Sequence, residues 1–232
     1  PAGLAALATL LFCAFLALFP AAAGGLAATA ANPTLRLLLA LPLAWGVSEW
    51  VRGWIFTGFP WLAVGYTQVP DGPLAGFAPL VGAYGVGYLF ALVAALLAWA
   101  ASRRGPLAPR LWGVAAAAAC CVAGLALRDA SWTTPAGPPT SVSLLQGNVS
   151  QDMKWRPEAT LATLRLYARQ AAAAPARLTV MPETALPVFE SDLPETYRTA
   201  LADLGRAHGG DLLIGMPTGD LAGAYYNSVV SL

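Results

Sequence analysis

Charged residues are scarce in this chain of 232 residues, since 13 basic and 12 acidic side chains make up only 11% of it. Soluble globular domains carry about 25% charged residues, so the composition excludes an ordinary soluble protein and indicates the membrane class. The formal net charge is +1, whereas nucleic-acid-binding proteins usually gather Lys and Arg opposite the phosphates. We therefore expect no nucleic-acid partner.

Histidine and cysteine are rarer still, with one His and three Cys. No group of His, Cys and acidic residues has metal-ligand spacing, and no Gly-rich phosphate loop is visible. Cys13, Cys120 and Cys121 lie in apolar runs without a neighbouring cation to stabilise a thiolate, so we interpret them as small hydrophobic residues rather than as a redox pair or metal ligands. We expect neither a metal ion nor a soluble cofactor.

Hydrophobic residues, in contrast, make up 57% of the chain and give a mean hydropathy of +0.60. Their distribution is uneven. Residues 1–130 are dominated by small and apolar side chains, 131–140 are rich in proline, and 141–232 alternate apolar and polar residues like a soluble domain. This shift predicts a transmembrane helical domain over 1–130, a linker over 131–140 and a second domain over 141–232.

About four stretches of the first domain are candidate membrane spans, for which roughly 20 mostly apolar residues are needed. They cover approximately residues 2–23, 35–55, 77–101 and 111–127. The second contains charged residues near its end, and the fourth is short. These two are the weakest candidates.

Arginine placement predicts the orientation of these spans. Arg103, Arg104 and Arg110 lie between the third and fourth stretches, and Arg36 follows the link between the first and second. Short loops rich in Lys and Arg stay on the cytoplasmic side. By alternation, the domain from residue 141 onward is expected on the outer face.

The run WGVSEWVRGWIFTGFPWLAVGYTQ, residues 45–68, is too rich in Trp, Gly and charge for an ordinary lipid-facing helix. Glu49 and Arg52 stand three residues apart, so on a helix they share a face and can neutralise each other. The following Gly58 and Pro60 break the helix, and irregular backbone at membrane depth needs protein or water to cover it.

Two interpretations of this run remain open. The first is an aromatic belt beside a helix that a proline terminates. The second is a lipid-binding mouth, in which Phe59, Pro60 and Trp61 grip acyl chains and Arg52 faces a phosphate headgroup.

The second domain alternates predicted strands and helices, which indicates an α/β fold with a site at the strand ends. We expect strands over residues 141–145, 178–181, 211–216 and 225–232, and helices over 158–174 and 193–208.

Glu183 directly follows the second expected strand and Pro182, whose fixed φ gives the carboxylate a rigid support. A carboxylate in a desolvated pocket can act as a general base, although a lone acid in a Pro-Glu-Thr turn, taken by itself, is more typical of an exposed loop. Upstream, Lys154 and Trp155 could line an entrance, with the ring on lipid and the ammonium on phosphate. They could also be a surface Lys and a Trp packed on the next helix.

The SEW-V-R-GW-I-F-TGFPW run and the segment LTVMPETALP, residues 178–187, resemble apolipoprotein N-acyltransferases, which are membrane members of the nitrilase-like carbon–nitrogen hydrolase superfamily. The resemblance implies an α-helical transmembrane bundle followed by an αββα sandwich, truncated here at the C-terminus. It also implies a Glu-Lys-Cys catalytic set in which Glu183 is the general base. Lys154 matches a different family position, so we expect the catalytic Lys and Cys beyond Leu232. Met181 stands where the family usually has Trp.

By the same resemblance, the parent protein is expected to transfer a fatty acyl group from a phospholipid to the N-terminal α-amino group of diacylglyceryl-cysteine lipoproteins through a thioester acyl-enzyme. It implies a multi-pass protein of the bacterial inner membrane with the nitrilase-like domain on the periplasmic side. Since the chain starts at Pro1 inside an apolar run, we expect it to be a fragment, and without the expected Lys and Cys we expect it to be inactive alone. Alternatives are a membrane-tethered nitrilase-like amidase and a non-catalytic lipid-binding module.

Overall fold

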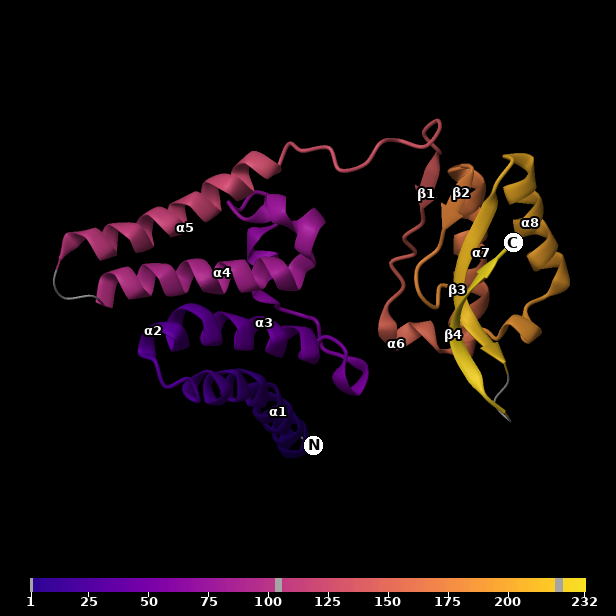
Figure 1. The fold of residues 1–232 in the computed structure, drawn as a ribbon. Coiled ribbons are helices and arrows are strands. Elements are labelled where there is room, and N and C mark those ends of the chain that lie inside the picture. Colours follow the sequence, from indigo (N-terminus) through magenta and orange to yellow (C-terminus); the bar gives the residue numbers. More distant parts are fainter. Residues whose placement is uncertain (1, 103–105, 220–222) are drawn as a thin grey trace. The chain divides into compact units, whose positions relative to one another are not determined.

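The computed structural model describes residues 2–102, 106–219 and 223–232 (Figure 1). The chain divides into two compact units, Pro1–Thr134 and Pro135–Leu232, which we call the helical unit and the α/β unit. Arg103 and Arg104, on which the predicted orientation partly depends, lie outside the described residues.

Three helices of the helical unit are long and apolar enough to cross a membrane. They are α1 (Ala2–Ala28), α4 (Ala78–Ser102, preceded by the 3-10 turn η4, Ala75–Phe77) and α5 (Leu107–Leu127). They match the first, third and fourth expected stretches. The chain is therefore a membrane protein.

The second expected stretch is also helical but is divided. A short helix α2 (Pro33–Leu35), whose first amides are capped by the Asn32 side chain, runs through a π-helical turn η1 (Arg36–Ala40) into α3 (Leu41–Arg52). Helix α3 packs against both α1 and α4. That this segment crosses a membrane stays a prediction. Two 3-10 turns follow, η2 (Ile55–Thr57) and η3 (Val64–Gln68).

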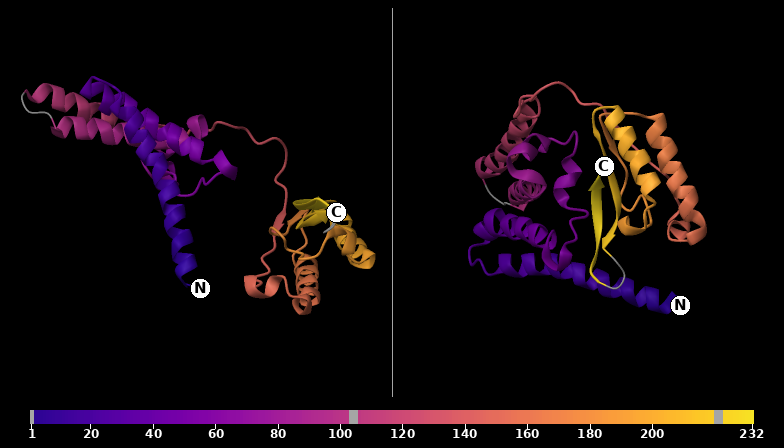
Figure 2. Two further views of the ribbon diagram at one scale, coloured as in Figure 1. Left: turned by 90° about the horizontal axis from the view of Figure 1, so that it is seen from below. Right: turned by 90° about the vertical axis from the view of Figure 1, so that its right-hand side faces the viewer.

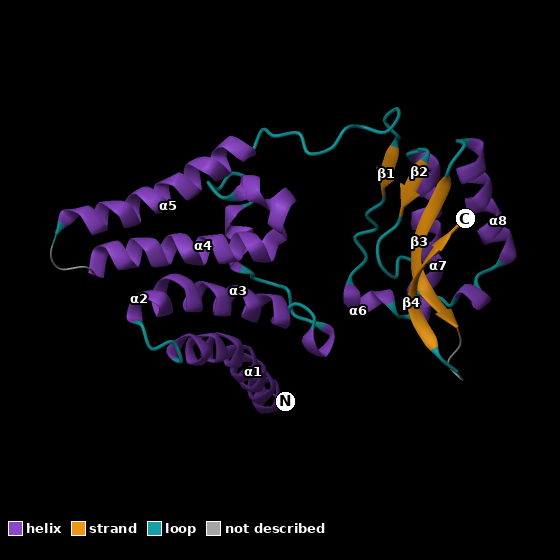
Figure 3. Cartoon of the chain, in the orientation of Figure 1, coloured by secondary structure: helices purple, strands orange, loops and turns teal. Residues whose placement is uncertain are grey.

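The α/β unit has the expected strands and helices, with boundaries shifted by no more than three residues. They are β1 (Val142–Leu144), α7 (Pro157–Ala173), β2 (Leu178–Val180), α8 (Glu195–Ala207), β3 (Asp211–Gly219) and β4 (Tyr225–Ser231). Two short elements that were not expected are also present, α6 (Gln151–Lys154) and η5 (Glu190–Asp192). The sheet order is β1-β2-β3-β4, with the first three strands parallel and β4 antiparallel to β3 (Figure 3).

Helices α7 and α8 cover the same face of this sheet (Figure 2). Between them and the strands lies the core, which includes Leu145, Leu164, Met181, Leu186, Leu201, Leu212, Ile214 and Met216. The opposite face of the sheet is open among the described residues and exposes Leu144 (77% exposed) and Val229 (70% exposed). One face is thus a packed core and the other an apolar surface next to the Glu183 segment.

Candidate active site

Glu183 lies in a tight turn at the C-terminal end of β2, which we call the Pro182–Ala185 turn. Met181 still pairs with β3, since its N–H donates to the Leu213 carbonyl at 2.8 Å. Pro182 has no N–H to continue this pairing, and the Ala185 N–H closes the turn on the Pro182 carbonyl at 3.1 Å. The sequence therefore ends the strand and lifts Glu183 out of it.

The turn lies directly on Gly215 of β3. A Cβ at Gly215 would be 2.3 Å from the Pro182 oxygen and 2.8 Å from the Glu183 Cα, closer than real Cβ atoms approach. The Leu186 N–H also donates to the Gly215 carbonyl at 3.3 Å. A glycine at this position of β3 is therefore required for the turn to sit where it does.

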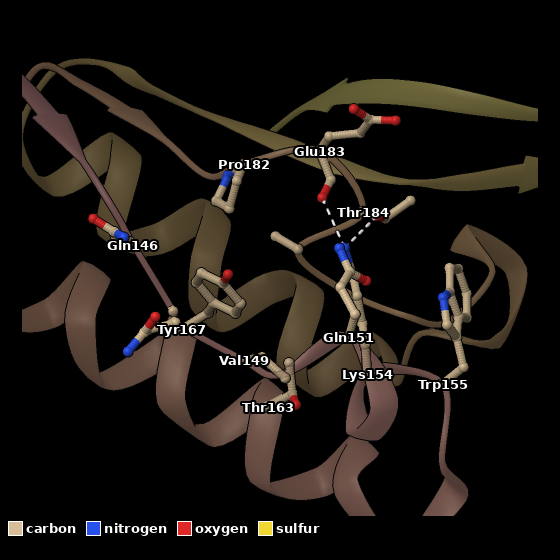
Figure 4. Close-up of a pocket in the computed structure, with 13 residues that line it drawn as sticks. Gln146, Val149, Gln151, Lys154, Trp155, Thr163, Tyr167, Pro182, Glu183 and Thr184 are labelled. Carbon is tan, nitrogen blue, oxygen red and sulfur yellow. Dashed lines mark hydrogen bonds between the residues drawn. The ribbon is translucent and has the colours of Figure 1, made fainter. Parts of the chain in front are cut away.

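The Glu183 side chain is exposed, and β4 fixes its direction. Oε1 accepts a hydrogen bond from the Asn227 side-chain Nδ2 at 2.5 Å. Figure 4 shows the carboxylate directed away from the Lys154 ammonium. Among the described residues, no cation forms an ion pair with this carboxylate.

Lys154 instead holds the main chain of the turn. Its Nζ donates to the Glu183 carbonyl oxygen at 3.2 Å and to the Thr184 Oγ1 at 2.6 Å (Figure 4). Thr184 has a positive φ of 44°, a strained conformation for a β-branched residue. The contact joins α6 to the turn, so Lys154 stabilises the support of Glu183 rather than pairing with its charge.

A cavity of about 400 Å³ lies beneath the turn, between it, α6 and α7. Trp155 lies at the edge of the cavity, with 60% of its own surface exposed. The polar residues that line the cavity include Gln146, Asn148, Gln151, Lys154, Thr163 and Tyr167. The cavity is large enough for a small polar group.

Sequence reasoning missed two residues of this cavity, Thr163 and Tyr167 on α7, both of which are buried. Burial raises the pKa of the Tyr167 hydroxyl, and a hydrogen bond from the Gly147 backbone opposes this rise. The feature of the sequence that could have identified them is their spacing of four residues, which places both on one face of a helix.

The remaining predicted residues belong to the helical unit. Arg52 ends α3, and its carbonyl accepts a hydrogen bond from the Phe59 N–H at 2.7 Å, which closes a loop over residues 53–59. Phe59 makes an edge-on contact with Phe12 of α1 at 5.1 Å between ring centroids. Trp61 is 69% exposed, and Pro60 is also exposed.

Glu49 and Arg52 do lie on one face of α3, as their spacing predicts. The shortest distance between their charged groups is 3.9 Å, from Arg52 Nη2 to Glu49 Oε1. The Nε and Nη2 atoms of Arg52 are buried and have no hydrogen-bond partner in the part of the chain that the structure describes. Arg52 therefore retains donors that an anionic group could use.

An apolar cavity of about 340 Å³ lies between α1 and α3 in the same unit. Its lining residues share an apolar character, with Ser48 as the polar exception, and are Phe15, Leu18, Phe19, Ala22, Ala23, Leu26, Ala44, Val47, Val51, Ile55 and Phe56. Phe56 contacts Phe15 at 6.1 Å between ring centroids, at the end of the cavity nearest the loop. The cavity suits an alkyl chain.

The structure thus brings Glu183, Lys154 and Trp155 together in the α/β unit, and Arg52, Phe59, Pro60 and Trp61 in the helical unit. Apolar helices long enough to span a bilayer and an α/β unit with a carboxylate at a strand end define a membrane protein with an α/β domain. Comparison with known proteins narrows this class.

The sequence model of the apolipoprotein N-acyltransferase N-terminal domain matches residues 1–96. Apolipoprotein N-acyltransferase of Chromobacterium violaceum is 47% identical over 100% of this chain and 45% of its own length. The proteins of that name from Methylococcus capsulatus and Nitrosomonas europaea are 45% and 44% identical over 97% and 98% of the chain. The chain matches the N-terminal portion of these apolipoprotein N-acyltransferases, and it spans about 45% of their length.

Proposed function

We propose that the protein containing this chain transfers a fatty acyl group from a membrane phospholipid to the α-amino group of the N-terminal diacylglyceryl-cysteine of lipoproteins. The observation that carries this proposal is similarity along almost the whole chain to proteins named apolipoprotein N-acyltransferase. The three apolar helices and the carboxylate at the end of β2 fit such an enzyme, since both of its substrates are lipids.

In the first step of the proposed reaction, Glu183 accepts the proton of a Cys thiol and the thiolate attacks the phospholipid ester carbonyl. The tetrahedral intermediate collapses to an acyl thioester. The departing lysophospholipid alkoxide takes the proton back from Glu183. In the second step, the lipoprotein amine attacks the thioester, loses a proton to Glu183 and releases the Cys, which is reprotonated.

This chemistry needs a Cys thiol beside the Glu183 carboxylate and a Lys ammonium that stabilises the oxyanion. The described residues of the α/β unit include no Cys, and Lys154 binds the main chain of the turn. The role that fits this chain's own residues is therefore that of the base and its support: Asn227 orients the carboxylate, and Lys154 and Gly215 fix the turn.

The helical unit would hold the phospholipid. The apolar cavity between α1 and α3 would receive an acyl chain, and Phe59, Pro60 and Trp61 would contact lipid at the interface. The unpaired buried donors of Arg52 would bind a phosphate oxygen. In the α/β unit, Trp155 and Lys154 would contact substrate at the edge of the cavity under the turn.

We further propose that the protein lies in the bacterial inner membrane with the α/β unit on the periplasmic side. Among described residues, Arg36 and Arg110 support this orientation, because they lie at the ends of helical segments that the alternation of spans places on the cytoplasmic side. The aromatic residues of the loop after α3 then face the opposite interface.

A transfer assay tests the proposal. The full-length protein is reconstituted with phospholipid carrying a labelled acyl chain and a diacylated lipopeptide with a free N-terminal amine. Label is expected on the lipopeptide, none on its N-acetylated form, and Glu183→Gln should slow transfer by roughly 10²- to 10⁴-fold. Release of free labelled fatty acid with no transfer would favour a hydrolase of the amidase type. Neither product, with lipid still bound, would favour a non-catalytic module.

A further inference from the structure

We propose that Glu49 is a positioning residue, whose carboxylate holds residues 53–63, here called the TGFPW loop, in the conformation that presents its apolar side chains. The inference deepens the proposed function, since it rests on that loop contacting phospholipid. It assigns to Glu49 a task other than neutralising Arg52.

Glu49 is a buried carboxylate in an apolar helical unit, with only 5% of its surface exposed. Burying such a group is costly unless it is hydrogen-bonded. Its bond goes to the main chain, because Oε1 accepts from the Val64 N–H at 2.9 Å. Arg52 Nη2 is 3.9 Å away, too far for a hydrogen bond. The backbone amide is therefore the partner that fixes the carboxylate.

Helix α3, the turn η3 and helix α4 pack closely around this carboxylate. A Cβ added to Gly87 of α4 would be 2.8 Å from Glu49 Oε2, and one added to Gly65 of η3 would be 2.0 Å from the Ala83 carbonyl of α4. Two glycines thus allow α3, η3 and α4 to approach one another. The carboxylate occupies a fixed position between them.

The TGFPW loop needs such support because its backbone is strained. Phe56, Thr57 and Leu62 have φ values of 51°, 74° and 59°, in the left-handed region that is costly for side chains other than glycine. Phe56 and Leu62 are nevertheless 79% and 87% exposed, so their own packing offsets only a small part of that cost. The compensation has to come from the ends of the loop.

Two hydrogen bonds close the loop on α3. The Phe59 N–H donates to the Arg52 carbonyl, and the Val64 N–H donates to Glu49. The first belongs to the backbone and is independent of side-chain identity. The second exists only with an acceptor at position 49, so the sequence specifies the loop conformation through Glu49.

The test measures hydrogen–deuterium exchange of residues 55–66 in the full-length protein in lipid nanodiscs. Glu49→Gln keeps an acceptor oxygen, Glu49→Ala removes it, and Val64→Pro removes the donor at the first position of η3, where proline is tolerated. We expect exchange within about 3-fold of wild type for Glu49→Gln, and about 10-fold faster for the other two variants. Asp71→Ala, which removes an exposed acid of the same unit, should not affect the loop.

The same variants should separate the Michaelis constant from turnover. We expect Glu49→Ala and Val64→Pro to raise KM for phospholipid by about 5- to 10-fold with kcat within about 2-fold, and Glu49→Gln to restore the wild-type KM. Even if Glu49→Ala does not fold, Val64→Pro tests the same bond from its other side.

Unchanged exchange in the variants lacking donor or acceptor would overturn the inference. Exchange in Glu49→Gln as fast as in Glu49→Ala would also overturn it, because charge rather than hydrogen bonding would then be responsible. Faster exchange with an unchanged KM would uphold Glu49 as the support of the loop, and it would refute the lipid contact assigned to that loop.

Discussion

The Asn227 side-chain amide donates a hydrogen bond to the Glu183 carboxylate, with 2.5 Å between Nδ2 and Oε1. These residues come from β4 and from the turn after β2, and β3 lies between the two strands. Gly215 of β3 allows the turn to cross over toward β4. The direction of the Glu183 side chain therefore depends on residues of three neighbouring strands, β2, β3 and β4.

Replacing Asn227 by Ala should slow acyl transfer by about 10-fold, because the carboxylate loses the donor that orients it while remaining able to accept a proton. Folding stability should change by less than about 1 kcal/mol, since the pair is exposed. Single-turnover kinetics and thermal unfolding measure the two effects. Ser231→Ala, also exposed on β4, is the matched control. Equal rates in Asn227→Ala and wild type would show that the bond does not matter for reactivity.

Gly215→Ala should destabilise the α/β unit by about 1–3 kcal/mol, because its Cβ cannot fit between β3 and the Pro182–Ala185 turn. Displacement of the turn should also lower activity. Gly24→Ala in α1, where an added Cβ meets nothing within 4 Å, should be neutral or slightly stabilising. Denaturation of the purified full-length variants measures the difference, and an unfolding midpoint for Gly215→Ala equal to that of wild type would contradict the close contact.

Lys154→Met should cost about 1 kcal/mol of stability, because two hydrogen bonds to the turn are lost. Thr184→Val removes only one of these bonds and should cost less. Because Lys154 is also proposed to contact substrate, the ratio of KM values for zwitterionic and anionic phospholipids should change in Lys154→Met but not in Thr184→Val. An unchanged ratio would show that Lys154 acts only through the turn.

We expect the buried hydroxyl of Tyr197 to make the folding stability fall at high pH. Its hydroxyl donates to the Leu164 carbonyl at 2.8 Å, and burial raises its pKa to about 12, whereas an unfolded Tyr titrates near 10. The unfolded state therefore loses this proton first. The contribution of Tyr197 is complete below about pH 10 and declines as the pH rises through about 12. The melting temperature should fall more steeply over this range in wild type than in Tyr197→Phe, and identical slopes would refute the assignment.

Much of the α/β unit could be predicted from the sequence, because its strands and helices alternate with clear breaks. Helix α7 begins at Pro157, one residue before its expected start, and α8 ends at Ala207, one residue before its expected end. The direction of the Glu183 carboxylate could not be predicted. It depends on Asn227 and on close contact at Gly215, which are contacts between residues far apart in the sequence.

In the helical unit, hydropathy predicted four spans, of which three are long helices, but it did not predict the division of the segment from Pro33 to Arg52 by a π-helical turn. The spacing of three residues on a helix predicted that Glu49 pairs with Arg52. The stronger bond of Glu49, to the Val64 amide, joins residues that are 15 apart. A hydrogen bond to a backbone amide cannot be recognised from the amino-acid sequence, because every residue except proline has that amide.

The central claim is that Glu183 is the base of an acyl-transfer site, and mass spectrometry of the acyl-enzyme tests it most directly. The full-length protein is incubated with phospholipid and no acceptor, as wild type, Glu183→Gln and Asn227→Ala. We predict a hydroxylamine-sensitive adduct of acyl mass in wild type, slower formation in Asn227→Ala, and loss or strong slowing in Glu183→Gln. An adduct that forms in Glu183→Gln as fast as in wild type would contradict the account.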